Sequence, residues 1–187
     1  MQTVYNDYFY DQQSEGSLRS ARWVVPHIVN LYKPNSIADI GGGVGTWCRA
    51  FEECGIQAIC YDGSYVDADK LQCKSFIALD LCEPLPFPIN SDLLLSLEVA
   101  EHLPPERAEG FIKDLCSIAP IIVFSAAVPG QGGTNHLNEQ PHSFWHGLFK
   151  AQGFEVDLKL RARIQTMHEV EPFYRNNIFT YHKVNHE

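Results

Sequence analysis

The chain has 187 residues, a length that suits one well-packed domain and is too short for two ordinary ones. Its formal net charge of −9 repels phosphate backbones, so nucleic acid is not an expected partner. No apolar run approaches the roughly 20 residues that span a bilayer, and residues 1–7 lack the basic start of a signal peptide. We therefore expect a cytoplasmic protein with no membrane contact that acts on a small molecule, in an oligomeric state that the sequence does not indicate.

Short apolar runs alternate with helical patterns along the chain, which indicates βαβ units and a mostly parallel sheet. In chain order we predict a helix over 17–32, a strand over 36–40, a helix over 46–53, strands over 56–61, 75–79 and 92–97, a helix over 107–117, a strand over 121–127, a helix over 143–152, and strands over 155–164 and 177–183. The long polar stretch 129–141 is predicted to be a loop that faces the substrate.

These elements define an α/β fold class. We expect a Rossmann-like, seven-stranded, mostly parallel sheet with helices on both faces and a C-terminal antiparallel hairpin. Residues 1–187 are predicted to form a single domain, with an N-terminal lead-in and helix over 1–33 and the Rossmann-like core over 34–187.

The cysteines form no CxxC pair and mostly lie in apolar stretches. We expect reduced, buried thiols, in keeping with a cytoplasmic protein, rather than a disulfide or zinc framework. The six are Cys48, Cys54, Cys60, Cys73, Cys82 and Cys116.

A glycine-rich run lies between the first predicted strand and the helix that follows it. Glycine permits positive φ and close approach of the backbone to a ligand, and the helix N-terminus offers unpaired N–H groups. The dinucleotide pattern GxGxxG fails here, because its third glycine would fall on Thr46 or on Cys48. The pattern DxGxGxG fits instead, on Asp39, Gly41, Gly43 and Gly45.

This pattern resembles motif I of the class I S-adenosylmethionine-dependent methyltransferases. The resemblance implies that the glycine loop packs against the methionyl part of the cofactor, with Asp39 orienting its amino group. Asp62 ends the second strand, where a carboxylate can accept hydrogen bonds from both ribose hydroxyls. Asp80 ends the third strand and, in the family, this position bonds the adenine amino group while the next residue, Leu81, covers the ring. Ligands of such sheets bind at the carboxyl ends of strands. Acids at three successive strand ends therefore favour a shared cofactor site over three unrelated turn residues.

The fourth predicted strand leads into an ExxEH motif formed by Glu98, Glu101 and His102. Helix-like backbone would place these side chains on one side, at the rim of the cofactor cleft, so Glu98 is also expected to contact the cofactor. The motif is similar to that of ubiquinone-pathway O-methyltransferases and of small-RNA 2′-O-methyltransferases. The second resemblance implies a divalent metal held by the two glutamates, His102 and a later histidine, for which His136 is the first candidate and His142 the second.

Such an oxygen-rich set suits Mg²⁺ or Mn²⁺, with Zn²⁺ or Fe²⁺ as further options. A metal would acidify a substrate hydroxyl, and the predicted catalytic residues are His102, Glu101 and His136. Glu–His after this strand also occurs in methyltransferases without a metal, where Glu caps a helix and His packs beside the cofactor. The metal therefore stays open at this stage.

We predict a methyltransferase that modifies a hydroxyl of a small molecule such as a sugar, a catechol or a natural product. One alternative is 2′-O-methylation of a terminal RNA ribose, which the ExxEH motif supports and the acidic charge opposes. Another is a protein that binds S-adenosylmethionine without catalysis, as a regulator or partner subunit.

Overall fold

The computed structural model describes the backbone of residues 7–86 and 88–184, and their side chains from residue 15 onward. Seven strands form one sheet in the order β3-β2-β1-β4-β5-β7-β6, and the strands from β3 to β5 pair in parallel. Strand β7 runs antiparallel to both of its neighbours, β5 and β6. The predicted fold class, with its C-terminal antiparallel pair of strands, is confirmed.

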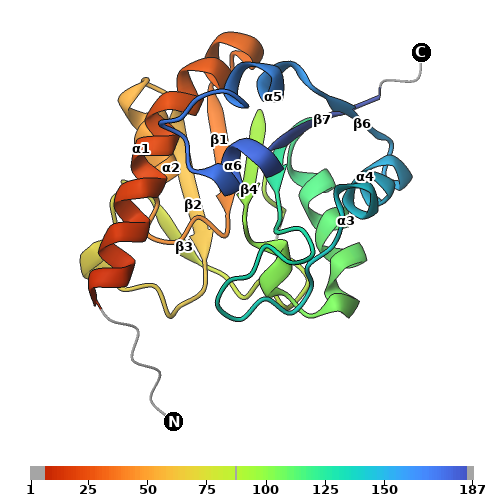
Figure 1. Ribbon diagram of the computed structural model, residues 1–187, viewed down its shortest axis with the longest axis horizontal. Helices are drawn as coiled ribbons and strands as arrows, with labels where there is room; N and C mark the ends of the chain where they lie inside the picture. Colours follow the sequence, from red (N-terminus) through yellow and green to blue (C-terminus); the bar gives the residue numbers. More distant parts are fainter. Residues whose placement is uncertain (1–6, 87, 185–187) are drawn as a thin grey trace.

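The elements follow the predicted order closely (Figure 1). The strands are β1 (Ser36–Ile40), β2 (Gln57–Asp62), β3 (Phe76–Ala78), β4 (Leu93–Leu97), β5 (Ile121–Ser125), β6 (Phe154–Asp157) and β7 (Phe179–Lys183). The helices are α1 (Asp7–Tyr32), α2 (Thr46–Glu53), α3 (Ala108–Ile118), α4 (His142–Ala151), α5 (Lys159–Ile164) and α6 (Pro172–Asn177). Short 3₁₀ turns span Ala68–Lys70, Ala100–His102 and Pro105–Arg107.

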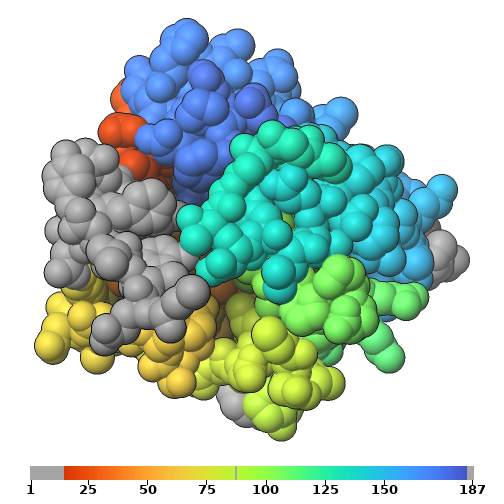
Figure 2. Space-filling model, turned by 60° about the horizontal axis from the view of Figure 1, so that its bottom comes forward, coloured from red at the N-terminus to blue at the C-terminus, as the bar shows by residue number. Residues whose placement is uncertain are grey.

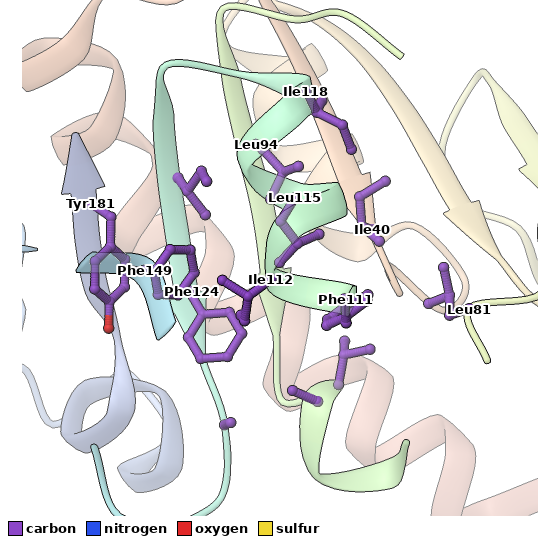
Figure 3. Close-up of a cluster of buried hydrophobic side chains, with 14 of the residues drawn as sticks. Ile40, Leu81, Leu94, Phe111, Ile112, Leu115, Ile118, Phe124, Phe149 and Tyr181 are labelled. Carbon is purple, nitrogen blue, oxygen red and sulfur yellow. The ribbon is translucent and has the colours of Figure 1, made fainter. Parts of the chain in front are cut away.

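Helices cover both faces of the sheet, and each face has its own apolar core. On one face, α3 and α4 pack on the sheet, and Figure 3 shows Ile112 and Leu115 of α3 near Leu94 of β4 and Phe124 of β5. On the other face, α1, α2, α5 and α6 supply buried residues such as Ile28. The central strand β4 is buried throughout, which accounts for its nearly unbroken apolar sequence.

One predicted element is wrong in part. The strand expected over 155–164 ends at Asp157, and helix α5 begins at Lys159. Leu160 and Ile164 are four residues apart and both fully buried, which is helical spacing, and Asp157 accepts a hydrogen bond from the backbone N–H of Lys159 at 2.8 Å. Helices α5 and α6 therefore form most of the connection between β6 and β7.

The thiols are also less uniformly buried than predicted. Cys54 and Cys82 are exposed, because they lie at the end of a helix and in a surface loop, whereas Cys48 and Cys60 are fully buried. Among the described residues, no helix has both the length and the apolar character required to cross a bilayer.

Candidate functional site

A cleft of about 770 Å³ opens where the parallel strands end, which is the position expected for ligands of such sheets. The volume is in the usual range for small-molecule sites. Figure 2 faces this end of the molecule, where the segment around residues 128–141, in teal, and the segments around residues 62–82, in yellow, border the same side. The predicted residues that line the cleft are Gly41, Asp62, Asp80, Leu81, Glu98 and His102.

The glycine loop joins β1 to α2 with three left-handed residues. Gly41 has φ +81°, and a Cβ built there would lie 2.4 Å from Cγ2 of Val99, so only glycine fits at this wall of the cleft. Gly43 has φ +57° and open space around its Cα. Gly43 and Gly45 lie behind the residues that line the cleft, where they shape the turn.

Asp62 lies at the end of β2 and is 5% exposed. One carboxyl oxygen accepts the N–H of Gly43 at 2.7 Å, which ties the glycine loop to the neighbouring strand. The other accepts the N–H of Gly63 and the hydroxyl of Tyr65, each at 2.6 Å. Tyr65 itself is 84% exposed. The hydroxyl that donates to the Asp62 carboxylate thus belongs to an exposed side chain, and the hydroxyl of a ligand could replace it.

Asp39 occupies a different place from the other predicted cofactor residues. It is 2% exposed and lies beneath the glycine loop, where a Cβ on Gly42 would come within 2.6 Å of its carboxylate. Burial, followed by the negative charge of Asp62, raises the pKa of Asp39 to about 7. Asp39 therefore supports the loop from below and does not line the cleft.

Asp80 and Leu81 form the wall next to β3. Asp80 accepts the N–H of Cys82 at 2.9 Å, and Leu81 is 8% exposed. The buried guanidinium of Arg107 anchors this wall, because it donates to the carbonyls of Leu81 at 3.1 Å and Glu83 at 3.0 Å. Arg107 also pairs with Asp114 of α3.

Loss of the Arg107 guanidinium is expected to destabilise the fold. Arg107→Met keeps an apolar stem but leaves two loop carbonyls and Asp114 without their donor, so the free energy of unfolding should fall by about 3 kcal/mol. Urea denaturation would measure the change. Lys113→Met, at an exposed position of α3, is the matched control and should change stability little. Equal stability of the two variants would contradict an anchoring role for Arg107.

The carboxylate of Glu98 is held by hydrogen-bond partners of its own, although its charge still acts on Glu101. The φ of Glu98, +56°, is rare for a residue with a side chain, and this left-handed geometry directs the carboxylate toward Gln131 and Asn177. Gln131 donates to it at 2.8 Å and Asn177 at 3.3 Å. Burial raises the pKa of Glu98, while these hydrogen bonds act in the opposite direction.

Glu101, His102 and His136 do converge. Their ligand atoms all lie within 4.8 Å of one another, and the two imidazole rings meet edge to face with centroids 4.9 Å apart. The 3₁₀ turn after β4 carries the first two, and the loop after β5 brings His136 to them. That loop is fixed to the turn, because the carbonyl of Glu101 accepts the N–H groups of Leu137 and Asn138. The structure therefore groups three of the four predicted metal ligands and places Glu98 outside that group.

The pKa values of the two catalytic candidates on the turn, Glu101 and His102, are shifted in opposite directions. Glu101 is fully buried, and among the described residues neither of its carboxyl oxygens finds a hydrogen-bond partner. Burial, and then the charge of Glu98, raise the pKa of Glu101 to about 8. His102 is exposed at the cleft, and partial desolvation together with His136 lowers its pKa, which favours the neutral imidazole at pH 7.

The buried carboxyl of Glu101 should give the protein a distinctive dependence of stability on pH. The folded state holds this proton up to about pH 8, whereas an unfolded glutamate loses it near 4.5. Between these values the folded state binds more protons, so stability falls as pH rises, by up to about 1.4 kcal/mol per pH unit from this group. Glu101→Gln should flatten the profile by about one proton when unfolding by urea is followed at several pH values.

Glu106→Gln, at an exposed glutamate of the neighbouring 3₁₀ turn, is the control and should leave the slope unchanged. A slope in Glu101→Gln that matches the wild type would show that Glu101 is ionised in the folded protein.

Two residues that the sequence did not single out organise the loop side of the site. Glu139 accepts the N–H groups of Gly130 at 2.8 Å and Gly132 at 3.0 Å, and it faces Nδ1 of His136 at 2.8 Å. The signal in the sequence that could have indicated Glu139 is its position three residues after His136, which places an acid and a histidine close together. Asn177, 2% exposed, bridges Glu98 and Gln131, and no sequence signal could have linked it to a glutamate 79 positions earlier.

His142, the second candidate for the later metal ligand, lies elsewhere. Its Nε2 is 3.2 Å from Oδ1 of Asn177, and its ring packs against Phe179. It is outside the group formed by Glu101, His102 and His136.

No family model matches the sequence, and no curated protein matches it. Solved structures do match the fold. An O-methyltransferase family protein from Burkholderia thailandensis has a TM-score of 0.70 and 12% identity, over 98% of this chain and 62% of that one. Magnesium protoporphyrin IX methyltransferase from Synechocystis PCC 6803, solved with bound S-adenosylmethionine, has a TM-score of 0.66 and 18% identity, over 92% of this chain and 80% of that one.

A third similar structure is human N-acetylserotonin methyltransferase in complex with S-adenosylmethionine, with a TM-score of 0.60 and 16% identity, over 90% of this chain and 51% of that one. This chain therefore spans less than two thirds of two of these three proteins. At such identities the likeness shows the fold alone, which this chain shares with these three methyltransferases.

Proposed function

We propose that this protein is an S-adenosylmethionine-dependent methyltransferase that transfers a methyl group to a hydroxyl oxygen of a small molecule. The observation that carries the proposal is the cleft at the strand ends, where a bare glycine backbone, two carboxylates and an apolar wall adjoin an imidazole at the reaction end. These are Gly41, Asp62, Asp80, Leu81 and His102.

The residues present suit the cofactor. Asp62 accepts a hydrogen bond from the hydroxyl of Tyr65, so its carboxylate is already arranged to accept one from a ribose hydroxyl. Asp80 is exposed beside Leu81, a pairing of one acceptor and one apolar surface that suits an adenine amino group and ring. Gly41 leaves the backbone bare at the wall next to Val99, where a methionyl chain would pass.

Bound S-adenosylmethionine would supply a methyl group activated by its sulfonium charge. The protein must then hold the acceptor hydroxyl in line and remove its proton. His102 suits the second task, because its lowered pKa leaves the imidazole neutral and able to accept a proton at pH 7. The carbonyl of Asn135, 3.4 Å from its Nδ1, is positioned to accept a hydrogen bond from that nitrogen and so to orient the ring.

We propose, as a second route for the same group, that Glu101, His102 and His136 hold a divalent metal. The metal would then activate the hydroxyl in place of the imidazole of His102, which has no free nitrogen once Nδ1 faces the carbonyl of Asn135 and Nε2 binds the ion. A cation would neutralise the unpartnered carboxylate of Glu101, and His136 already faces a second carboxylate, Glu139, as metal-bound histidines commonly do. The metal would lower the pKa of a bound hydroxyl and favour acceptors with two adjacent oxygens, such as catechols and sugar diols. Glu98, held by Gln131 and Asn177, is assigned to the wall of the cofactor cleft instead of to the metal.

The proposal is tested first by binding. S-adenosylhomocysteine should raise the melting temperature of the protein, and NAD should not, because the glycine spacing excludes the dinucleotide pattern. Repeating the measurement with Mg²⁺, Mn²⁺ and EDTA tests the metal separately. The absence of any shift with the nucleoside would refute the methyltransferase assignment.

Activity is then tested with radiolabelled S-adenosylmethionine and a panel of catechols, sugars and short RNAs. Transfer to a hydroxylated small molecule supports the proposal. Transfer only to RNA, with a steep salt dependence, would identify the terminal ribose as the acceptor instead. Binding without transfer to any acceptor of the panel would favour a non-catalytic role.

A further inference from the structure

A cluster of thiols and one carboxylate lies directly beneath the glycine loop. Asp39 and Cys60 are register partners on the parallel strands β1 and β2, so their side chains leave the sheet on the same face. Cys48, in the first turn of α2, lies above them, with its sulfur 3.7 Å from Oδ2 of Asp39. The carboxyl oxygen and the two sulfurs are all within 4.8 Å of one another. These three residues are separate from the lining of the cleft.

Cys73 adds a third sulfur from the segment that precedes β3. Its thiol donates to the carbonyl of Ser75 at 3.5 Å, and its side chain interacts electrostatically with that of Cys60. Cys73 is half-buried, whereas Cys48 and Cys60 are fully buried. The cluster therefore has one member near solvent, through which an ion could enter.

The glycine loop fits closely around the cluster. A Cβ on Gly42 would lie 2.7 Å from the sulfur of Cys60, and a Cβ on Gly45 would lie 2.4 Å from the sulfur of Cys73. The backbone thus passes over the sulfurs with no side chain between them.

The carboxylate of Asp39 lacks a compensating positive charge. It is 2% exposed, and within the described part of the chain its hydrogen-bond donor is a neutral thiol, while the ion pairs of Lys, Arg and His all involve other acids. An ionised carboxylate in such a place is costly unless a cation binds beside it. This is a second observation, independent of the thiols, that points to a cation.

We propose that Asp39, Cys48, Cys60 and Cys73 form a binding site for one thiophilic divalent cation, Zn²⁺ by preference. Zinc takes four ligands in tetrahedral geometry and accepts both thiolate sulfur and carboxylate oxygen. Tetrahedral ligands about 2.3 Å from the ion are roughly 3.8 Å apart. The ligand atoms of Asp39, Cys48 and Cys60 lie within 4.8 Å of one another and need only a small contraction, and the half-buried Cys73 would move inward to complete the four. Sulfur ligands exclude Mg²⁺ and Ca²⁺, which take oxygen.

Binding of the ion releases the protons of the thiols, so we expect it to weaken as pH falls. The ligands come from two strands, a helix and a loop, so the sequence carries no CxxC pair to indicate them.

The site is tested with Cd²⁺, which forms an ultraviolet charge-transfer band with thiolates but not with the Glu101, His102 and His136 group. Reduced, EDTA-treated protein titrated with Cd²⁺ should show the band saturating at one equivalent, and Zn²⁺ should remove it by displacement. The triple variant Cys54→Ser, Cys82→Ser, Cys116→Ser is the matched control and should keep the band. The double variant Cys48→Ser, Cys60→Ser should lose it. The absence of a band in the wild type, or its persistence in the double variant, would overturn the proposal.

A second measurement uses the wild-type protein alone, in case the double variant fails to fold. Zn²⁺ should protect Cys73 from alkylation by iodoacetamide at least about tenfold, as seen by peptide mass spectrometry, because a metal-bound thiolate is withdrawn from reaction. The exposed Cys54 and Cys82 should be labelled at the same rate with and without Zn²⁺. Equal labelling of Cys73 in both conditions would contradict its place in the site. Neither experiment depends on S-adenosylmethionine, so the result stands apart from the proposed enzymatic function.

Discussion

Replacement of Asp62 by alanine is expected to lower the affinity for S-adenosylhomocysteine by at least about 100-fold, because two effects combine. The variant loses the carboxylate that we propose for the ribose hydroxyls, and hydrogen bonds to a charged group contribute about 1.5–3 kcal/mol each. It also loses the acceptor for the N–H of Gly43, which ties the glycine loop to β2. Isothermal titration calorimetry would measure the change.

Two further variants serve as controls for this result. Asp69→Asn, at an exposed acid of the same connection between β2 and β3, should bind the nucleoside like the wild type. Tyr65→Phe removes the hydroxyl that Asp62 accepts and leaves the carboxylate in place, so binding should be unchanged or tighter. Wild-type affinity in Asp62→Ala would place the cofactor elsewhere and contradict the proposed site.

Replacement of His102 by alanine is expected to reduce the rate of methyl transfer by about 100-fold to 10,000-fold, the usual contribution of a general base. The affinity for S-adenosylhomocysteine should change by less than about threefold, because Asp62 and Asp80 form the proposed nucleoside end of the cleft. Single-turnover transfer of a radiolabelled methyl group would measure the rate. His168→Ala, at an exposed histidine between α5 and α6, serves as the control and should keep the wild-type rate.

The companion variant His136→Ala distinguishes a base from a metal ligand. If the metal assists the reaction, this variant should be as slow as His102→Ala, and higher Mn²⁺ should restore part of its rate. If His102 acts alone, His136→Ala should lose far less, because Asn135 still holds the ring of His102 through its carbonyl. A His102→Ala enzyme with more than half of the wild-type rate would contradict both roles.

The fold was predictable from the sequence to a large extent. Strand β4 is an apolar run that is buried on both faces, and Gly55 follows the C-cap of helix α2 with a positive φ, so local patterns were sufficient for both. Helix α5 was not predicted, because Glu155 to Ile164 contains a short segment whose apolar spacing fits a strand and a helix about equally. Burial of Leu160 and Ile164 against α1 and β7 decided between them.

The candidate site was predictable only in part. The acids that end β2 and β3 could be found from the sequence, because each directly follows an apolar run. The orientation of Glu98 could not, since the partners of its carboxylate, Gln131 and Asn177, lie far away in the chain. The position of Asp39 beneath the loop likewise depends on how α2 packs over β1 and β2.

By itself, the sequence determined the order of strands and helices, the glycine spacing and the set of acids at successive strand ends, because these follow from local periodicity and turn chemistry. Tertiary structure alone decided which side chains meet. It grouped Glu101 and His102 with His136, gave Glu98 hydrogen-bond partners of its own, and brought Cys48 and Cys60 to Asp39. The physical reason is that such contacts are fixed by strand pairing and helix packing between segments far apart in the chain, and residue spacing does not encode those distances.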